Sequence, residues 1–303
     1  MINTITITSE LSESLILELA NPEKSGLAIK SIDGLGPSKA SINVTELVTS
    51  DVSLFNSSRI NYRTITFNIL YVDCPTIEQS RLKTYKYFPI KGKIKITFQT
   101  DNRNVYCNGY VEDNKQIIFD KKSGCTITIV CPDPFFYTEG KKISDDSFIG
   151  INNLFSFPFF NDSLSENLIE FGEIPNYPEQ TIWFDGEYSN GMIIDIYATK
   201  TVNNPTIYNI DTGESMSIDT DKIIKITKRA FSTGDRIIIN TNKGQKSVTL
   251  LRDGEEINII SCLRSFKTWF TLKKGENKFT YKATSGGEAI TISYDYAEAY
   301  EGI

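Results

Sequence analysis

Histidine is absent from this chain of 303 residues. Its absence excludes the usual serine–histidine and cysteine–histidine nucleophilic sites, histidine-liganded zinc, and the commonest general base at neutral pH. No apolar run approaches the ~18 residues that a membrane span needs. The first residues, MINTITITSELSES, lack the basic and apolar regions of a signal peptide. We therefore expect no membrane binding by the chain itself and no secretion through a signal peptide.

Positive charge is also in short supply. The formal net charge is −6 and the isoelectric point is near 5.0, which argues against tight binding to a phosphate backbone. No G-x-x-x-x-G-K-[ST] loop is present for nucleotide phosphates. The lysines of KYFPIKGKIKI (86–96) alternate with apolar residues, as on the solvated face of a strand.

Cysteine is scarce and its spacing is irregular. The odd number of five does not suggest a disulfide framework. Cys125 and Cys131 would lie ~20 Å apart on an extended strand, too far to form a disulfide bond or to share an ion. We expect buried, reduced thiols and no metal site or cofactor.

Strand patterns dominate what is present, and the length suffices for two domains. Apolar and polar residues alternate in 4–8, 63–71, 93–100 and 126–130, as in half-buried strands. In 93–100, Ile94, Ile96 and Phe98 should face a core. After residue 168, short strands alternate with turn sequences such as DTGE, STGD, NKG, RDG and KKGEN, which predicts an all-β sandwich.

One helix is expected after Pro75, where Thr76 and Gln79 fit a capping box. Its apolar residues fall within roughly 140° of arc, so they should form the face that packs on a sheet. These residues are Ile77, Leu82, Tyr85 and Phe88.

Three segments do not fit these patterns. Residues 34–59 are rich in glycine and small polar residues, which indicates a long excursion used for interaction. CPDPFFY (131–137) ends a strand with two prolines and three aromatics that look exposed. Residues 138–167 have no period but contain five phenylalanines, so this segment should pack on something. We predict domains at 1–137 and 168–303, joined by 138–167 as a linker.

Two motifs suggest chemistry, and each has a structural alternative. IDTGES (210–215) contains the Asp-Thr-Gly of aspartic proteases, but these need a second such carboxylate, and a turn between strands explains Asp211. In WFDGEY (183–188), Trp183 and Tyr188 could form a weak sugar-stacking platform. The alternative is a strand that ends at an Asp-Gly turn with Trp183 in the core. We assign no catalytic residue and expect no enzyme.

The ordered set of motifs resembles the distal tail protein family of long-tailed bacteriophages. The resemblance rests on sequences that follow one another at family-like spacing. They are DGLGPSKASINVTE, FNSSRINYRTITFNILY, IEQSRLKTYKYFPIKGKIKITFQTDNR, GYVE and VCPDPFFY in the first half, and FGEIPNYP, NPTIYNIDTGESMSI, GDRIIINTNKGQKSVTLLRDG, WFTLKKGENKFTYKA and YEGI in the second.

The resemblance implies a mainly β protein. Its N-terminal domain would be a tail-tube-like β-barrel or sandwich with one packed helix. Its C-terminal domain would be a galectin-like or carbohydrate-binding-module-like sandwich. Residues 34–59 would be a belt that grips a neighbouring copy. Contacts between copies or at the domain junction would involve Pro132, Pro134, Phe135, Phe136 and Tyr137. The three aromatics would be buried against a neighbour or against the edge of their own domain.

The resemblance also implies a place in a virion. Six copies would form a ring, with formal charge six times −6, through which DNA passes without being retained. The partners would be the tail tube protein, the tape measure protein, the tail-tip hub protein, and receptor-binding or baseplate proteins. The protein would be located at the virion tail tip, after assembly in the bacterial host cytoplasm. The alternative function is a carbohydrate-binding adhesion module.

Overall fold

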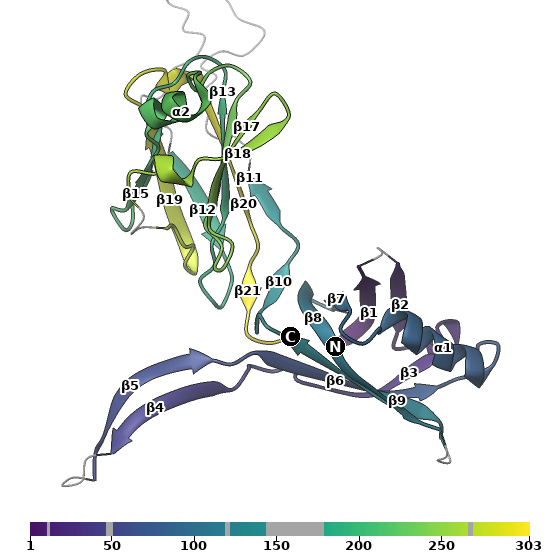
Figure 1. The fold of residues 1–303 in the computed structure, drawn as a ribbon. Coiled ribbons are helices and arrows are strands. Elements are labelled where there is room, and N and C mark those ends of the chain that lie inside the picture. Colours follow the sequence, from purple (N-terminus) through teal and green to yellow (C-terminus); the bar gives the residue numbers. More distant parts are fainter. Residues whose placement is uncertain (11–12, 47–50, 119–121, 144–178, 266–268) are drawn as a thin grey trace, which may run out of the picture. The chain divides into compact units, whose positions relative to one another are not determined.

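The computed structural model describes the chain except for residues 11–12, 47–50, 119–121, 144–178 and 266–268 (Figure 1). It is mainly β and separates into two compact units. Unit 1 comprises Met1–Glu139 and Ala299–Ile303, and unit 2 comprises Gly140–Glu298. The final five residues, which the sequence analysis assigned to the C-terminal domain, therefore lie in unit 1. Of the predicted linker, residues 144–167 lie outside the described residues.

Unit 1 is built on one antiparallel sheet of nine strands, in the order β2-β1-β7-β8-β9-β6-β3, with β10 paired to β8 and β21 paired to β10. The strands of unit 1 are β1 (Ile2–Ser9), β2 (Ser14–Glu18), β3 (Leu27–Asp33), β4 (Ala40–Glu46), β5 (Ser53–Ile60), β6 (Arg63–Tyr71), β7 (Lys93–Thr100), β8 (Asn104–Ile117), β9 (Gly124–Cys131), β10 (Phe136–Thr138) and β21 (Ala299–Tyr300); its helices are η1 (Pro22–Lys24) and α1 (Ile77–Tyr87).

The alternating strands predicted from the sequence form the core of this unit. In β7, Ile94, Ile96 and Phe98 are buried as expected. The rings of Phe67 and Phe98 stack with centroids 6.5 Å apart. The sheet is not a closed barrel, because among the described residues its end strands β2 and β3 do not pair with each other. The predicted mainly β fold, a barrel-like sheet or sandwich with one packed α-helix, is confirmed, and it takes the form of an open sheet.

Helix α1 packs on unit 1 through a different face from the one predicted. Thr76 caps it by accepting a hydrogen bond from the Gln79 amide, as expected. The residues that face the sheet are Ser80, Thr84 and Phe88, whereas the side chains of Ile77, Leu82 and Tyr85 are exposed.

A glycine explains how this polar face can approach so closely. A Cβ atom at Gly26, whose φ is +81°, would lie 2.1 Å from the Ser80 hydroxyl oxygen, so only glycine leaves room there. The Ser80 hydroxyl donates to the Val72 carbonyl at 2.7 Å, which satisfies it on burial.

Unit 2 consists of two antiparallel sheets, in the orders β11-β20-β13-β16-β17-β18 and β12-β19-β14-β15. Its strands are β11 (Lys141–Ile143), β12 (Glu179–Phe184), β13 (Ile193–Ala198), β14 (Thr206–Asn209), β15 (Ser215–Ser217), β16 (Arg236–Asn240), β17 (Ser247–Arg252), β18 (Glu255–Asn258), β19 (Gly275–Lys282) and β20 (Ile290–Tyr296); its helices are α2 (Thr220–Thr227), η3 (Ile260–Cys262) and η4 (Gly287–Ala289).

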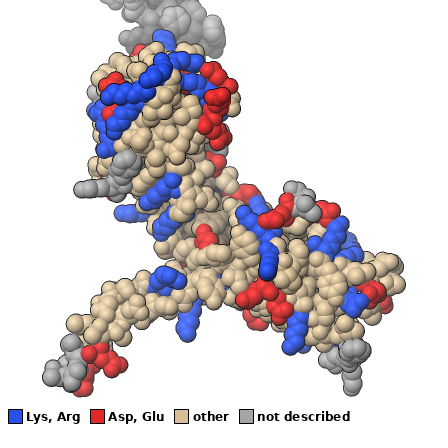
Figure 2. Space-filling model, viewed as in Figure 1, with Lys and Arg blue, Asp and Glu red and all other residues tan. Residues whose placement is uncertain are grey.

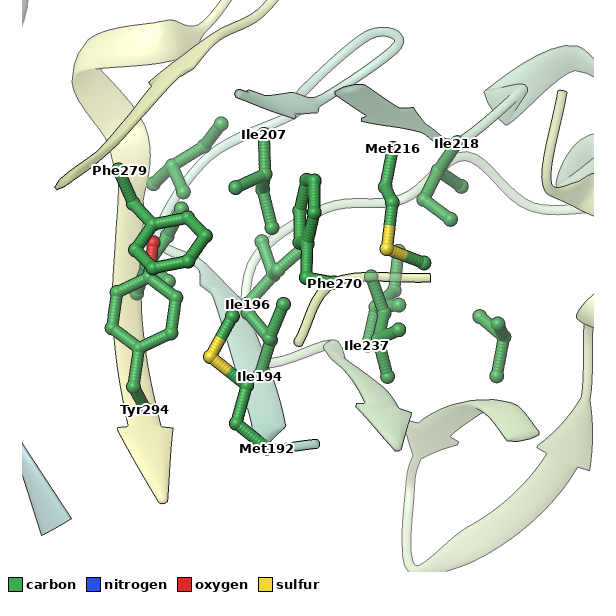
Figure 3. Packing of buried hydrophobic residues seen from close by; sticks show 14 of the residues in the cluster. Met192, Ile194, Ile196, Ile207, Met216, Ile218, Ile237, Phe270, Phe279 and Tyr294 are labelled. Carbon is green, nitrogen blue, oxygen red and sulfur yellow. The ribbon is translucent and has the colours of Figure 1, made fainter. Parts of the chain in front are cut away.

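Apolar side chains from both sheets of unit 2 meet in one core. Figure 3 shows Ile194, Ile196 and Ile237 facing Ile207 and Met216, with the Phe270 ring between them. Each of the five predicted turn sequences contains a glycine with positive φ, a backbone conformation that glycine adopts at little cost. The predicted C-terminal β-sandwich is confirmed.

Candidate interaction surfaces

The corner after β9 is built into unit 1. Phe136 is fully buried, and its ring meets that of Phe98 edge-to-face with centroids 5.8 Å apart. Phe135 is also buried, with 9% of its surface exposed. Tyr137 and Pro134 are half-buried, and Pro132 is exposed. Although the sequence makes all three aromatics look exposed, Phe135 and Phe136 pack within their own unit.

The chain holds this corner rigid through Asp133. The Asp133 carboxylate accepts a hydrogen bond from the Phe135 amide at 3.2 Å and one from the Tyr137 hydroxyl at 2.7 Å. Beyond the corner, β10 pairs with β21, where Phe136 lies opposite Tyr300. A contact of this corner with a neighbouring copy stays a prediction.

Arg63 is the side chain that organises the region, and the sequence analysis did not single it out. It is 2% exposed, and its guanidinium lies 4.2 Å from the centre of the Phe136 ring. Burial lowers the pKa of Arg63. The sequence pattern could have pointed to Arg63, because the two-residue period of β6 places it on the same face as Ile65 and Phe67. A charged residue in register with a core face indicates a specific set of acceptors.

A pocket of about 180 Å³ lies beside Arg63. Ala40 and Ile60 from the roots of β4 and β5 form one part of its lining, and Pro134 and Phe135 another. Ser38 also lines it, and the Ser38 hydroxyl is buried without a hydrogen-bond partner.

Strands β4 and β5 form a two-stranded ribbon that extends away from the nine-stranded sheet (Figure 1). All its residues except the half-buried Ile60 are exposed. This ribbon lies in the excursion predicted at 34–59. An isolated two-stranded ribbon is marginally stable in water at best, so this one needs a surface to pack on.

The two faces of the ribbon differ. One carries Ala40, Ile42 and Val44, with Ile60 and Phe55 opposite the first and last of these. The other face carries Leu54 opposite Thr45 but is otherwise polar. Hydrogen bonds join its side chains, from Asn43 to Ser57 at 3.0 Å and from Asn56 to Thr45 at 2.7 Å. Figure 2 shows the ribbon largely free of charge except near its root and its far end.

A second exposed apolar surface of unit 1 lies on α1. Ile77, Leu82 and Tyr85 are 44%, 50% and 43% exposed. These are three of the four residues that the sequence assigned to the buried face. Of the four, only Phe88 packs on the sheet, and it does so beside the small residues Ser80 and Thr84.

In unit 2, Trp183 and Tyr188 are placed in different surroundings. Trp183 lies on the outward face of β12 and is 61% exposed, so the alternative that put it in the core is wrong. Tyr188 is half-buried, with the Lys243 ammonium 4.3 Å from its ring centre. Near Trp183, the outward face carries Thr181 and, on the neighbouring strand, Glu276.

The aspartate of the DTG sequence makes a structural hydrogen bond. The Asp211 carboxylate accepts a hydrogen bond from the Lys278 backbone amide at 2.7 Å. Across the described ranges, no three Cys, Asp or Glu side chains are grouped as they would be to hold a metal ion. In the same part of the chain, no helix is long and apolar enough to cross a membrane.

Comparison with known proteins identifies the second half of the chain. Residues 185–299 match the model of the siphovirus-type tail component, C-terminal domain. This part of the chain is similar to that domain. No curated protein sequence matches the chain.

Two solved structures have the same fold over nearly the whole chain. The Dit (gp 19.1) protein of phage SPP1, described as a paradigm of the hub adsorption apparatus in phages that infect Gram-positive bacteria, matches with a TM-score of 0.64 and 11% identity, over 97% of this chain and 98% of that one. A chain of the phage P2 baseplate in its activated conformation with calcium matches with a TM-score of 0.50 and 13% identity, over 97% and 98%.

The resemblance to the distal tail family is thereby confirmed. The family model establishes it for most of unit 2. The match to the SPP1 protein covers unit 1 as well, and at 11% identity it shows a shared fold.

Proposed function

We propose that this protein is a structural hub of a phage tail tip, without catalytic activity. In this role it joins the tail tube to the tail-tip and receptor-binding apparatus. The proposal is supported by the tail-component domain at 185–299 and by the fold that the chain shares with a hub protein of phage SPP1.

The observation that carries the assembly part of the proposal is the ribbon β4–β5. Its apolar face, with Ile42, Val44 and Phe55 each more than half exposed, is not covered by any described part of the chain. A face of this kind on a protein with a hub fold is best explained by burial against another copy. A head-to-tail contact closes into a ring when its rotation closes. We infer six copies in the ring, with a channel that DNA crosses.

The remaining partners follow from this position. The tail tube protein would stack on one side of the ring, and the tail-tip hub, tape measure and receptor-binding or baseplate proteins would meet the other side or the channel. The protein would then reside at the virion tail tip after assembly in the host cytoplasm. The net charge of −6 per copy disfavours retention of DNA in transit.

Binding of the protein to the ends of tail tubes tests the hub proposal. Gold-labelled full-length protein, mixed with tubes assembled from the tail tube protein encoded in the same genome, should label one end of each tube in negative-stain images. Label along the tube wall, or tubes without label at saturating protein, would contradict a hub at the tail tip.

A carbohydrate-binding function is the second candidate, and the exposure of Trp183 favours it. An exposed indole beside polar side chains such as Thr181 and Glu276 can stack on a sugar ring while its neighbours hydrogen-bond to the hydroxyl groups. Full-length protein should then bind a glycan array, and Trp183→Ala should abolish the binding while Tyr188→Phe retains it. Equal binding by Trp183→Ala, or none by the native chain, would eliminate this function.

A further inference from the structure

Three segments that are distant in sequence converge on the Arg63 guanidinium. Nη1 donates to the carbonyl oxygens of Gly34 at 2.6 Å and Gly36 at 2.5 Å, just before the ribbon. Nε donates to the Pro134 carbonyl at 2.7 Å, where the chain leaves unit 1. Nη2 donates to the Glu301 carbonyl at 2.6 Å, in the segment that returns to unit 1.

The buried charge of Arg63 makes each of its hydrogen-bond acceptors important for the stability of this cluster. A buried cation needs strong acceptors, and here all four hydrogen bonds go to backbone carbonyls, with the Phe136 ring beneath the guanidinium. Hydrogen bonds from a charged donor are roughly twice as strong as neutral ones. If one segment moves away, the arginine loses an acceptor that buried surroundings do not replace.

A second set of contacts ties the same segments together. The Ile303 amide donates to the Leu35 carbonyl at 3.2 Å, which joins the end of the chain directly to the root of the ribbon. At the other root, the Asn61 amide donates to the Lys39 carbonyl at 3.0 Å. Side-chain and backbone contacts therefore connect the terminal segment 299–303 to the base of the ribbon.

We propose that Arg63 is a positioning residue that fixes the root of the ribbon to the terminal segment 299–303. The direction in which the ribbon leaves unit 1 then depends on the last residues of the chain, although these follow unit 2 in sequence. The proposal concerns the folded single chain, so it does not depend on the hub function. If the ring forms, the proposal implies that loss of residues 301–303 impairs it through the ribbon.

Hydrogen exchange followed by mass spectrometry on the full-length protein tests this proposal. In Arg63→Lys, a compact ammonium with three donors replaces the planar five-donor fork. We expect amide exchange to become about tenfold faster in peptides that cover 34–40 and in those that cover 299–303. Exchange in β7 (Lys93–Thr100) should not change. A chain shortened by residues 301–303 should show the same faster exchange at 34–40.

Arg103→Lys is the matched control. Arg103 stacks on the Tyr300 ring at 4.1 Å, so it contacts the same terminal segment but is not among the donors to Gly34 or Gly36. This variant should leave exchange at 34–40 unchanged.

Three results would overturn the proposal. They are unchanged exchange in Arg63→Lys, a change confined to one of the two segments, and an equal increase throughout unit 1, which would mean general destabilisation. If Arg63→Lys does not fold, the chain shortened by residues 301–303 decides alone. Oligomeric state, measured on the same samples, reports on the hub function separately, because the exchange result stands whether or not a ring forms.

Discussion

At the scale of single residues, unit 2 contains a buried ion pair between Asp235 and Arg252, which are 1% and 7% exposed. Arg252 Nε lies 2.8 Å from Asp235 Oδ1 and Nη2 lies 2.5 Å from Oδ2, so the pair is bidentate. Nη2 also donates to the Ala230 carbonyl at 2.7 Å, beyond the end of α2. Burial opposes ionisation of Asp235, but hydrogen bonds from Arg252 and the Ser232 amide outweigh it and hold the pKa of this carboxyl below its usual value.

This pair predicts how the stability of unit 2 depends on pH. Because the folded-state pKa is below the unfolded value of about 3.9, the stabilisation is complete above that value and is lost as the pH falls through the folded pKa. Asp235→Asn should reduce the free energy of unfolding at neutral pH by about 3 kcal/mol, since it leaves Arg252 buried without its counter-charge. Trp fluorescence during urea denaturation reports this, because Trp183 and Trp269, the two tryptophans of the chain, both lie in unit 2.

Asp253→Asn is the control for that measurement. The Asp253 side chain is 73% exposed, so its ion pair with Arg229 should contribute less than about 1 kcal/mol. Its φ is +54°, a conformation that asparagine tolerates. Equal losses in the two variants would contradict a stabilising role for the buried pair.

The thiols give a second prediction at this scale. Cys107, Cys125, Cys131 and Cys262 are buried, whereas Cys74 is partly exposed. Burial raises the pKa of Cys125 to about 11, so little reactive thiolate forms at neutral pH. A thiol-specific chromogenic disulfide should titrate one cysteine in the native protein and five in denaturant. Rapid reaction of two or more native thiols would contradict the burial of Cys107, Cys125 and Cys131 in unit 1 or of Cys262 in unit 2.

At the scale of elements, the ribbon offers two neighbouring residues on opposite faces. Val44→Asp places a negative charge on the apolar face, and Asn43→Asp places the same charge on the polar face. Both positions are exposed, so neither change should affect folding by more than about 0.5 kcal/mol. Val44→Asp should prevent association of copies, and Asn43→Asp should permit it; sedimentation velocity at matched concentrations distinguishes the two. Association by both variants would rule out the apolar face as the contact.

Helix α1 shows what sequence patterns could and could not predict. Its first residues followed from the cap at Thr76, because a capping box is a local signal. Its packed face did not, because close approach through Ser80 depends on Gly26, which lies on a different part of the chain. The strands could be predicted because their signal is local. In a strand with a two-residue period, the alternate apolar side chains are the ones that face the core.

The candidate surfaces were also predictable only in part from the sequence. Composition alone indicated that residues 34–59 leave the sheet. The ribbon's division into an apolar and a polar face depends on register, which includes an irregularity between Asn43 and Val44. Phe136 packs against Phe98 and Arg63, and its strand pairs with β21 from the far end of the chain, contacts that no local pattern encodes.

At the scale of the whole molecule, unit 2 is inserted in sequence between residue 139 and residue 299 of unit 1. The connecting segments β10 and β21 pair with each other inside unit 1. In the proposed hub, unit 1 supplies the contacts between copies, and unit 2, the tail-component domain, is available for other partners.

The mass of the full-length protein in solution, measured across a concentration series together with negative-stain images, tests this account most directly. We predict ring-shaped particles with a mass six times the 34.2 kDa of one chain. A protein that stays monomeric at the highest concentration, and also in the presence of the tail tube protein, would contradict it.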